Sequence, residues 1–352
     1  MTEKPSLPSR LLTLAAAIVL AALALEGICR VFMPHWQDYD SGRFMRSVIV
    51  PNFGEVSTGM PEFDDYFAQK DGDFRVRVSI NGFGLRNLQA VEFADERIWA
   101  VGDSVTFGWG VEADEMYSSI IARLAAKPTY NIASPGTDVC GYQALIARMP
   151  ETFRPKAVII GLVLENDVGH YEGCQKRAEL TAAAKTTPEA GKAGLLGAKK
   201  WLTRYSALYN VLAVSIKRLD AIRDFMTKIG IISKSHDSKR SFDEGEIEIM
   251  TDKTAAEFVR LRSILPEATP LAVLIVPGRL EIRDDHPSFR KMRLMISAKL
   301  DAVGIKVIDP FEEFKKAGLA ATHFAHDGHW NAPGHEIAGR AAADWIKSIN
   351  ID

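Results

Sequence analysis

The sequence predicts an α/β protein in which helices cover both faces of a mainly parallel sheet, preceded by an apolar helix. Short apolar runs lack strict alternation, and helical segments lie between them. Strands buried on both faces have this appearance, and strand–helix alternation is typical of parallel sheets. The 352 residues, 47% hydrophobic and 25% charged, suit a globular chain of one large domain or two ordinary ones. The net charge of −2 gives no electrostatic reason to expect a nucleic-acid partner.

The amino-terminal element is an apolar stretch at residues 11–25, interrupted only by Thr13. As a helix it spans about 22 Å, less than the roughly 30 Å hydrocarbon core of a bilayer. Continuing to Cys29 brings the length close to that thickness, and Arg30 can extend its charge to the interface. We therefore expect residues 1–30 to form a signal anchor or transmembrane helix.

Two alternatives to an anchor stay open at this stage. Ala22-Leu23-Ala24 is similar to a signal-peptide cleavage site, and a buried soluble helix has the same composition. With an anchor or a signal peptide, Lys4 and Arg10 hold the amino terminus in the cytoplasm. The rest of the chain is then exported to the periplasmic or extracytoplasmic side.

Residues 31–95 are expected to form a mixed segment. Residues 74–80 alternate as an edge strand does, and the glycines of residues 81–87 predict a turn. The main α/β domain is expected over residues 96–352. Its predicted strands are residues 98–101, 130–133, 157–164, 271–276 and 305–308. Its predicted helices are residues 115–126, 142–149, 251–265, 289–303 and 334–349.

An insert of mainly helical character is expected to interrupt this domain at about residues 171–249. Residues 178–200 are rich in Ala, Lys, Gly and Thr, which predicts a flexible or weakly helical segment. Residues 201–222 have apolar side chains at helical spacing, and this helix can pack on the domain, form a lid or bind a partner. Residues 233–246 are polar and predict a loop.

The residues that follow the predicted strands carry the candidate chemistry, because ligands of parallel α/β sheets bind beyond the carboxyl ends of the strands. A serine nucleophile needs a general base, and that base needs an orienting carboxylate. We expect Ser104, His329 and Asp327 in these roles. The developing oxyanion needs preorganised donors, for which we expect the backbone of Ser104 and Gly136 and the amide of Asn166.

Each of these residues also has a purely structural interpretation. Ser104 can be a helix cap, Gly136 a turn residue after Pro135, and Asn166 a cap of the third strand. Asp103 is expected to hold the turn through side-chain hydrogen bonds rather than to take part in chemistry. The ordered combination of the blocks favours catalysis over three independent structural roles for Ser104, Gly136 and Asn166.

This ordered set resembles the SGNH hydrolase family, also called GDSL-like esterases. Ser104, Gly136 and Asn166 match its first three blocks, and Asp327 with His329 matches the last. The resemblance covers residues 96–170 and 250–352, and its most specific pieces are GDSVTFGWGV and DGHWNAPGH. INGFGLRN is similar to a segment that precedes the first block in membrane-anchored members. The resemblance implies a three-layer α/β/α sandwich of SGNH/flavodoxin-like type and acyl-enzyme chemistry without a cofactor.

In the common family pattern, the Asp of the last block lies three residues before its His. Here His326 occupies the position three residues before His329, and Asp327 lies only two residues before it, so the last block departs from that pattern. The Asp-x-His-Trp spacing instead resembles that of members that acetylate cell-surface polysaccharides, which favours carbohydrate esters over lipids. Trp109 and Trp330 are candidates to stack on a sugar ring, with packing as the alternative.

Four of the eight histidines lie near this block, at His323, His326, His329 and His335. Imidazoles and a carboxylate can bind zinc. However, the chain has no His-Glu-x-x-His helix, and a Pro-Gly pair separates the last histidine from the others. We expect no metal site. The absence of a Gly-x-Ser-x-Gly elbow argues against an α/β-hydrolase.

The three cysteines are Cys29, Cys140 and Cys174, and none forms a Cys-x-x-Cys pair, which argues against a thiolate zinc site. Cys140 follows the Gly136 loop and Cys174 follows the Asn166 loop. If both loops serve one oxyanion, they meet at one sheet edge, and an oxidising compartment permits a bridge. Two free thiols are the alternative.

The sequence thus predicts an ester hydrolase or O-acyltransferase acting on acetyl esters of envelope or extracellular carbohydrate, or on another small acyl ester. Its expected partners are that substrate and, through the amino-terminal helix, a membrane. The alternative is a non-catalytic saccharide-binding or assembly component of a polysaccharide system, which an ester assay distinguishes from an enzyme.

Overall fold

The computed structural model describes residues 7–69, 72–184, 197, 201–218, 242–349 and 351. The chain divides into two compact units. One unit comprises residues 1–40 and 189–237, and the other comprises residues 41–188 and 238–352. Of the insert expected at residues 171–249, residues 185–196, 198–200 and 219–241 lie outside the described residues.

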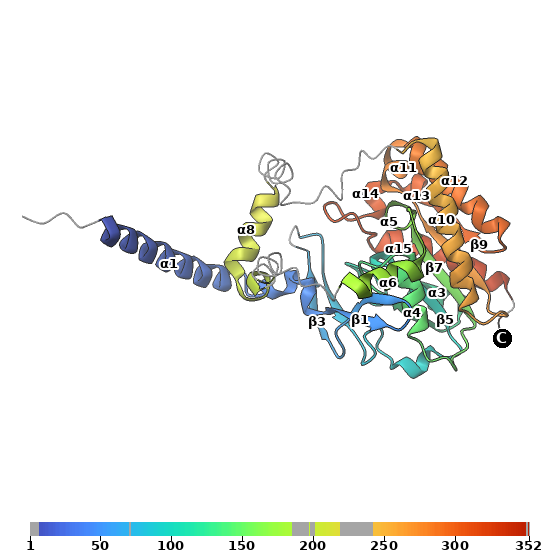
Figure 1. The fold of residues 1–352 in the computed structure, drawn as a ribbon, viewed down its shortest axis with the longest axis horizontal. Coiled ribbons are helices and arrows are strands. Elements are labelled where there is room, and N and C mark those ends of the chain that lie inside the picture. Colours follow the sequence, from blue (N-terminus) through green and yellow to red (C-terminus); the bar gives the residue numbers. More distant parts are fainter. Residues whose placement is uncertain are drawn as a thin grey trace, which may run out of the picture. The chain divides into compact units, whose positions relative to one another are not determined.

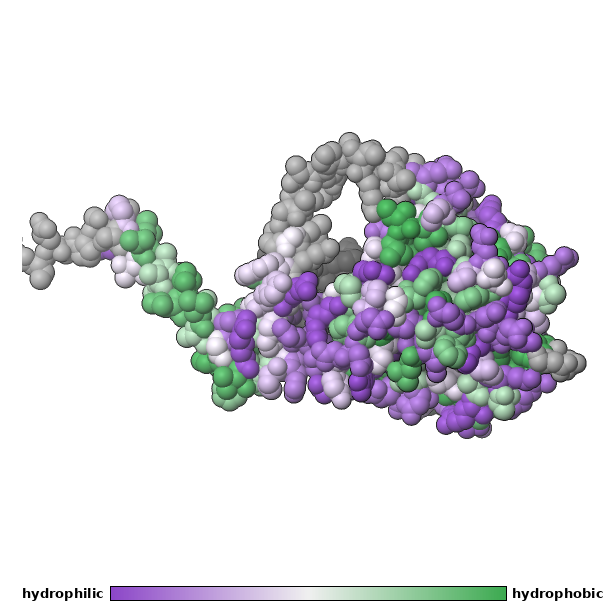
Figure 2. Space-filling model, turned by 90° about the horizontal axis from the view of Figure 1, so that it is seen from below, coloured by the Kyte–Doolittle hydropathy of each residue, from purple (hydrophilic) through white to green (hydrophobic). Residues whose placement is uncertain are grey.

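The first unit contains the long helix α1 (Leu7–Phe32), the 3-10 turn η1 (Trp36–Tyr39) and helix α8 (Ala207–Arg218). Residues 201–205, just before α8, are also helical. Within α1, the 23 residues Arg10–Phe32 are long and apolar enough to cross a membrane, a property that a signal sequence shares. Apolar residues dominate the visible surface of this helix (Figure 2).

The second unit contains a five-stranded sheet whose strands are all parallel (Figure 1). Their order across the sheet is β6-β5-β7-β8-β9. The bounds are β5 Ile98–Gly102, β6 Thr129–Ala133, β7 Ala157–Val163, β8 Leu271–Val276 and β9 Lys306–Ile308. The five predicted strands are therefore confirmed. Four differ from the prediction by one residue at one end, and β8 agrees at both ends.

Helices cover both faces of this sheet and give it two separate apolar cores. Alternate residues of β5 enter different cores: Trp99 and Val101 face one, and Ile98 and Ala100 face the other. The first core is covered by α4 (Val139–Ala147), α10 (Glu244–Ser263) and α12 (Pro287–Ala302). The second is covered by α3 (Tyr117–Ala125), α13 (Phe311–Ala317) and α15 (Ala332–Ser348). This is the predicted three-layer α/β/α arrangement.

Shorter helices fill the connections of the second unit. They are η2 Ser41–Arg43, η3 Val91–Ala94, α2 Ser104–Phe107, α5 Leu164–Asp167, α6 Cys174–Ala184, α11 Arg279–Asp284 and α14 Leu319–Thr322. Helix α10 begins within the polar residues that predict a loop. The Asp243 carboxylate accepts a hydrogen bond from the N–H of Glu246 and caps the helix. The polar residues 243–246 thus form the cap and first turn of α10, whereas residues 233–241 of the predicted loop lie outside the described residues.

The segment before β5 forms two antiparallel hairpins. They are β1 Met45–Val50 with β2 Gly54–Gly59, and β3 Asp64–Ala68 with β4 Arg75–Ser79. The predicted strand at residues 74–80 corresponds to β4. The second hairpin supplies Phe67 and Phe74 to a third apolar cluster, which also includes Phe107 from the loop after β5. This hairpin therefore packs beside the carboxyl end of the sheet.

Candidate active site

Ser104 begins helix α2, directly after strand β5. The Asp103 carboxylate caps this helix by accepting a hydrogen bond from the N–H of Val105, at 2.8 Å. A Cβ at position 102 would lie only 2.1 Å from Oγ1 of Thr106, so the turn requires glycine there. Asp103 therefore has the structural role that its place in the sequence predicts.

Ser104, His329 and Asp327 form one chain of hydrogen bonds. Oγ of Ser104 lies 2.8 Å from Nε2 of His329, and Nδ1 of His329 is hydrogen-bonded to Oδ1 of Asp327. With Nδ1–H donating to the carboxylate, Nε2 is free to accept the serine proton. The His329 side chain is 26% exposed and the Asp327 side chain 8%, so the hydrogen-bonded series is more open to solvent at His329 than at Asp327.

The charge of Asp327 is favoured by its surroundings. Burial by itself raises the pKa of this carboxyl, but the hydrogen bonds and charge of His329 outweigh burial and hold the pKa below its ordinary value. Nε2 of Gln69 donates a second hydrogen bond to Oδ2 at 2.8 Å. An ionised Asp327 orients the imidazole and stabilises its protonated form.

The β3–β4 hairpin also holds the backbone of the loop that carries Asp327. Oδ2 of Asp73 accepts hydrogen bonds from the N–H of His326 at 2.8 Å and from the N–H of Asp327 at 3.0 Å. Nδ1 of His326 lies 2.8 Å from the other oxygen of Asp73. Sequence reasoning missed Gln69 and Asp73, because neither belongs to a motif and both lie more than 250 residues from their partners.

The two further expected oxyanion donors lie in the loops after β6 and β7. Gly136 has φ of +75°, the left-handed region that favours glycine, and a Cβ there would enter open space. Ser134 N–H donates to the carbonyl of Gly102 at 3.1 Å, which ties this loop to the end of β5. Asn166 is exposed in α5, and its side chain is hydrogen-bonded to Asp103.

A second buried carboxylate, Asp167, holds the Asn166 turn in place. Its Oδ2 accepts hydrogen bonds from the Tyr142 hydroxyl and from the N–H of Val163, both at 2.7 Å. Burial, together with the nearby charge of Asp103, raises the pKa of Asp167 well above its ordinary value. Burial likewise raises the pKa of Asp103, against the opposing hydrogen bond from Val105. The two carboxyls therefore disfavour simultaneous ionisation.

The two tryptophans expected to contact substrate have different surroundings. The ring of Trp109 stacks on the His329 imidazole, with centroids 5.7 Å apart, and meets Phe67 edge-on at 4.5 Å. Trp330 is only 1% exposed and stacks on Phe314 at 4.8 Å. The sugar-stacking expectation for Trp330 is therefore corrected: its ring faces lie in the apolar core under α15.

The four histidines near the last block have four different environments. His329 meets Ser104, and His326 meets Asp73. Burial lowers the pKa of His323 to about 4, with the nearby Arg279 charge adding to the effect. Burial also lowers the pKa of His335 to about 3. Among the described residues, no three His, Cys, Asp or Glu side chains group closely enough to hold a metal ion.

Arg86, from the segment INGFGLRN, supports the loop that follows Ser104. Its guanidinium is buried and donates to the backbone carbonyls of Gly108 and Val111, and to that of Arg77 in the β3–β4 hairpin at 3.0 Å. Burial lowers the pKa of Arg86 to about 10. The segment was noted as a motif, but its contact with the nucleophile loop was not predicted.

Cys140 and Cys174 form a disulfide that joins the first turn of α4 to the first turn of α6. Arg177 of α6 forms an ion pair with Asp138, the residue that caps α4. A cavity of about 620 Å³ opens beside this bridge, and its wall includes Asp138 and Asn166. The loops after β6 and β7 thus meet at one side of Ser104.

No protein-family model and no curated protein matches this chain. Solved structures with a similar fold include a G-D-S-L-family lipolytic protein from Veillonella parvula (13% identity, 72% and 99% of the two chains covered, TM-score 0.39). An acetylxylan esterase from Geobacillus stearothermophilus has 14% identity, 71% and 94% coverage and a TM-score of 0.38. A carbohydrate esterase family 2 enzyme from Corynascus thermopiles has 14% identity, 72% and 67% coverage and a TM-score of 0.41.

Proposed function

We propose that this protein is a serine esterase or O-acyltransferase that works through an acyl-enzyme on Ser104. The observation that carries this proposal is the hydrogen-bonded series from Ser104 through His329 to Asp327. A binding protein has no need for a base aligned on a serine hydroxyl, nor for a buried carboxylate aligned on that base.

In the proposed reaction, Oγ of Ser104 attacks the ester carbonyl while Nε2 of His329 takes the serine proton. Asp327 stabilises the imidazolium that forms. The tetrahedral oxyanion is held by the N–H groups of Ser104 and Gly136 and by the Asn166 amide. Collapse expels the alcohol, which leaves with the proton from His329. The acyl-enzyme then reacts with water or with a second hydroxyl by the same steps in reverse.

We further propose carbohydrate acetyl esters as the substrate class. This rests on the resemblance of the Asp327-x-His329-Trp330 spacing to family members that acetylate polysaccharides. Trp109 remains the proposed aromatic contact for a sugar ring, since it lies against the base. The proposed location is extracytoplasmic, with α1 as an uncleaved anchor, because Lys4 and Arg10 precede the apolar stretch.

The first experiment tests the nucleophile with a chromogenic acetyl ester and a fluorophosphonate probe. Ser104→Ala should abolish ester turnover and covalent labelling. Ser119→Ala is a matched control, because the hydroxyl of Ser119 on α3 donates to the backbone carbonyl of Ala113 rather than contacting His329. Retention of most activity by purified Ser104→Ala would contradict the mechanism and leave the non-catalytic saccharide-binding function.

A second experiment separates transfer from hydrolysis. The purified protein receives an acetyl-ester donor with and without oligosaccharide acceptors, and acetylated sugar and free acetate are both measured. A transferase must place a sugar hydroxyl near His329 and limit competition by water. If lipid or aryl esters react quickly while no saccharide is acetylated or deacetylated, the carbohydrate proposal is wrong and a general esterase remains.

A reporter fused to the carboxyl terminus tests the location. A reporter that is active only outside the cytoplasm is expected, and one active only in the cytoplasm would contradict export. An antibody or mass measurement on the amino-terminal residues distinguishes the uncleaved anchor from a cleaved signal peptide.

A further inference from the structure

Glu26 is the one charged residue between Arg10 and Arg30 in the apolar helix α1. Charged residues within membrane spans are rare and usually have partners, and Glu26 lies one helical turn before Arg30. Glu26 has four: it accepts hydrogen bonds from the Ser206 hydroxyl, from the N–H groups of Ala207 and Leu208, and from Nε of Arg30, at 2.7–3.0 Å.

The partners of Glu26 show what this carboxylate does. Ala207 and Leu208 are the first residues of helix α8, so Glu26 caps the amino terminus of a helix about 180 residues away in the sequence. The first N–H groups of a helix have no partner within it, and a negative charge there is favoured by the helix dipole. The first unit thus holds α8 on α1 by charge-assisted hydrogen bonds.

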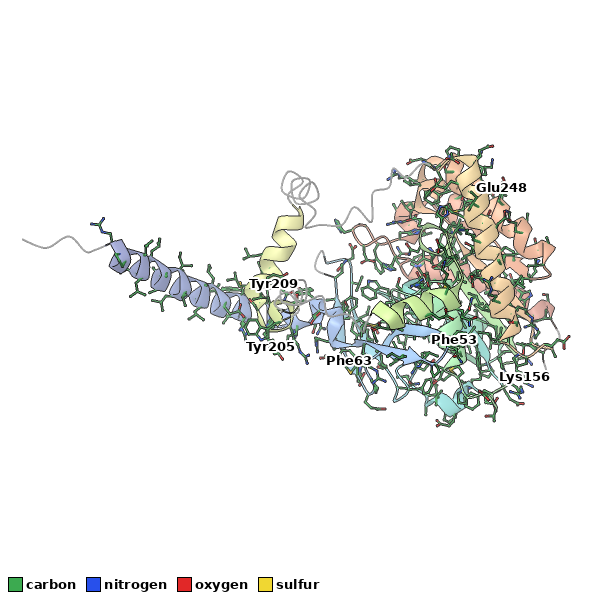
Figure 3. All side chains as sticks on the ribbon, viewed as in Figure 1. Phe53, Phe63, Lys156, Tyr205, Tyr209 and Glu248 are labelled. Atoms are coloured by element: carbon green, nitrogen blue, oxygen red, sulfur yellow. A yellow bond between two sulfur atoms is a disulfide. The ribbon has the colours of Figure 1, made fainter. Side chains whose placement is uncertain are left out.

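Arg30 strengthens the same junction. Its guanidinium donates to the carbonyl of Tyr205 at 2.7 Å and lies over the ring of Trp36, 5.4 Å from its centroid. The end of α1, the turn η1 and the start of α8 therefore form one cluster. Tyr205 and Tyr209 mark the α8 side of this cluster in Figure 3.

The depth of this cluster follows from helix geometry. The 20 residues from Arg10 to Arg30 correspond to about 30 Å along a helix, which equals the usual thickness of the hydrocarbon core. With Arg10 at one boundary, Arg30 lies at the other. Because Tyr205 is hydrogen-bonded to Arg30, the start of α8 lies at the level of the lipid headgroups.

The exposed side chains of this segment suit that level. Trp201, Tyr205 and Leu212 are 61%, 49% and 50% exposed, and the rings of Trp201 and Tyr205 lie 5.7 Å apart. The basic residue Arg204 is exposed beside them, 5.7 Å from the Tyr205 ring. Trp and Tyr concentrate at membrane–water interfaces, where an apolar ring and a polar edge are both accommodated.

We propose that residues 201–212 form a second membrane-contact surface, docked on the anchor helix through Glu26, whose Trp201, Tyr205 and Leu212 insert into the headgroup region of the bilayer. The occupant of this surface is lipid. This inference rests on the proposed anchoring of α1 and is independent of the proposed esterase chemistry. It gives part of the insert a definite role, which is to hold one of its helices at the membrane.

The test uses the full-length chain in two sets of vesicles, one with lipids brominated on the acyl chain near the headgroup and one with lipids brominated near the end of the acyl chain. Cys29→Ala leaves Cys140 and Cys174 in their disulfide, so that a single added cysteine carries a fluorophore. Leu212→Cys is the test position, Leu20→Cys in α1 is the anchor position, and Leu294→Cys in α12 is the matched control. These leucines are 50%, 66% and 55% exposed.

Bromine near the headgroup should quench the label at position 212, bromine near the chain end should quench the label at position 20, and neither should quench the label at position 294. Glu26→Leu should lower quenching at position 212 without affecting position 20, whereas Glu26→Gln, which can still accept hydrogen bonds, should preserve part of it. Equal quenching at positions 212 and 294 would overturn the proposal. Loss of position 20 from the mature chain would overturn the anchor on which it rests.

Aryl-ester turnover is measured for every variant in the same vesicles. We expect unchanged turnover in Glu26→Leu, because Glu26 belongs to the first unit and has no place in the proposed reaction. An inactive chain that is quenched at position 212 contradicts only the enzymatic proposal. An active chain that is unquenched there contradicts only the membrane-contact proposal.

Discussion

The two halves of the proposed triad are supported in different ways. The turn that carries Ser104 is held mainly by its own neighbours in sequence: Gly102 fits under Thr106, and Asp103 caps the helix. The loop that carries Asp327 and His329 is held by Gln69 and Asp73, which belong to a hairpin far away in the sequence. One half is thus a local motif, and the other depends on tertiary packing.

This difference explains why motif reading finds Ser104, the proposed nucleophile, more readily than it finds the residues that support His329, the proposed base. A turn held by local contacts must contain its own glycine and capping residue, and these leave a recognisable pattern. A loop held by a distant hairpin needs only a suitable donor and acceptor somewhere in the chain. The base-bearing half is therefore the part whose function should depend most on residues outside the motifs.

The largest expected effect on activity comes from removing His329, because its imidazole contacts both Ser104 and Asp327. His329→Ala should lower kcat by roughly a thousandfold or more, because members of a triad act as a unit. Ester turnover by purified protein, with unfolding temperature as the control, measures this. A modest loss would mean that another group accepts the serine proton.

Removal of the Cys140–Cys174 disulfide tests the half of the site that contains Ser104. This bridge joins the loops after β6 and β7. The two cysteines are 34 residues apart. Closing a loop of this length stabilises a folded chain by roughly 3–4 kcal/mol. Cys140→Ser with Cys174→Ser should lower the free energy of unfolding by about that amount, as measured in guanidinium chloride. An unchanged midpoint would show that the bridge adds nothing, and free thiols found by mass spectrometry in the exported protein would show that it does not form.

Asp73 tests the dependence of the base-bearing loop on the hairpin. Asp73→Ala leaves two loop N–H groups without their acceptor. Loss of the equivalent of one hydrogen bond to a charged group, about 1.5–3 kcal/mol, should lower kcat/KM roughly ten- to a hundredfold. Asp73→Asn should recover part of the loss.

The control lies on the same hairpin. Asp64 forms an exposed ion pair with Arg77 and does not contact the loop, so Asp64→Ala should keep nearly full activity. Equal losses in Asp73→Ala and Asp64→Ala would point to general damage to the hairpin and would contradict a specific role for Asp73.

Gln69 gives a smaller effect on the same side. Gln69→Leu removes one neutral hydrogen bond to Oδ2 of Asp327, worth about 1 kcal/mol, so kcat should fall several-fold with little change in KM. Gln69→Glu should be worse, because it places a like charge beside Asp327. If the leucine variant matches the parent in kcat and the glutamate variant matches it too, the contact has no part in orienting Asp327.

The buried histidines predict a gradual pH effect on stability. His323 and His335 have folded-state pKa values of about 4 and about 3, below the value near 6.5 expected when unfolded. The unfolded chain therefore binds more protons between these values. Stability should be complete above about pH 6.5 and fall on acidification towards pH 4, by at most about 1.4 kcal/mol per pH unit for each histidine.

Denaturant unfolding at several pH values measures this dependence. His323→Gln should show a shallower decline than the parent chain. An identical slope in the two proteins would contradict a neutral, buried His323.

The sequence carries much of the fold because the three central strands of the sheet are buried on both faces, as the run LAVLIV of β8 illustrates. It also identifies Ser104, His329 and Asp327, which the structure places in hydrogen-bond contact. It leaves the role of Trp330 open between packing and substrate contact, because an aromatic residue next to a histidine looks the same in sequence whether it faces substrate or packs on Phe314. It gives no sign of Gln69 or of the capping of α8 by Glu26, because both are contacts between distant segments.

The backbone pairing on either side of His329 determines how the loop that carries this residue can move. The N–H of Phe324 donates to the carbonyl of His329 at 2.9 Å, and a bridge pairs His323 with Trp330. Residues 325–328 thus form a short loop whose two ends are joined by backbone hydrogen bonds, next to the buried Trp330 ring. Its excursions can be local, without separation of the sheet layers. The rate of hydrogen–deuterium exchange at the Phe324 amide would therefore report the free energy of displacing the base, separately from that of global unfolding.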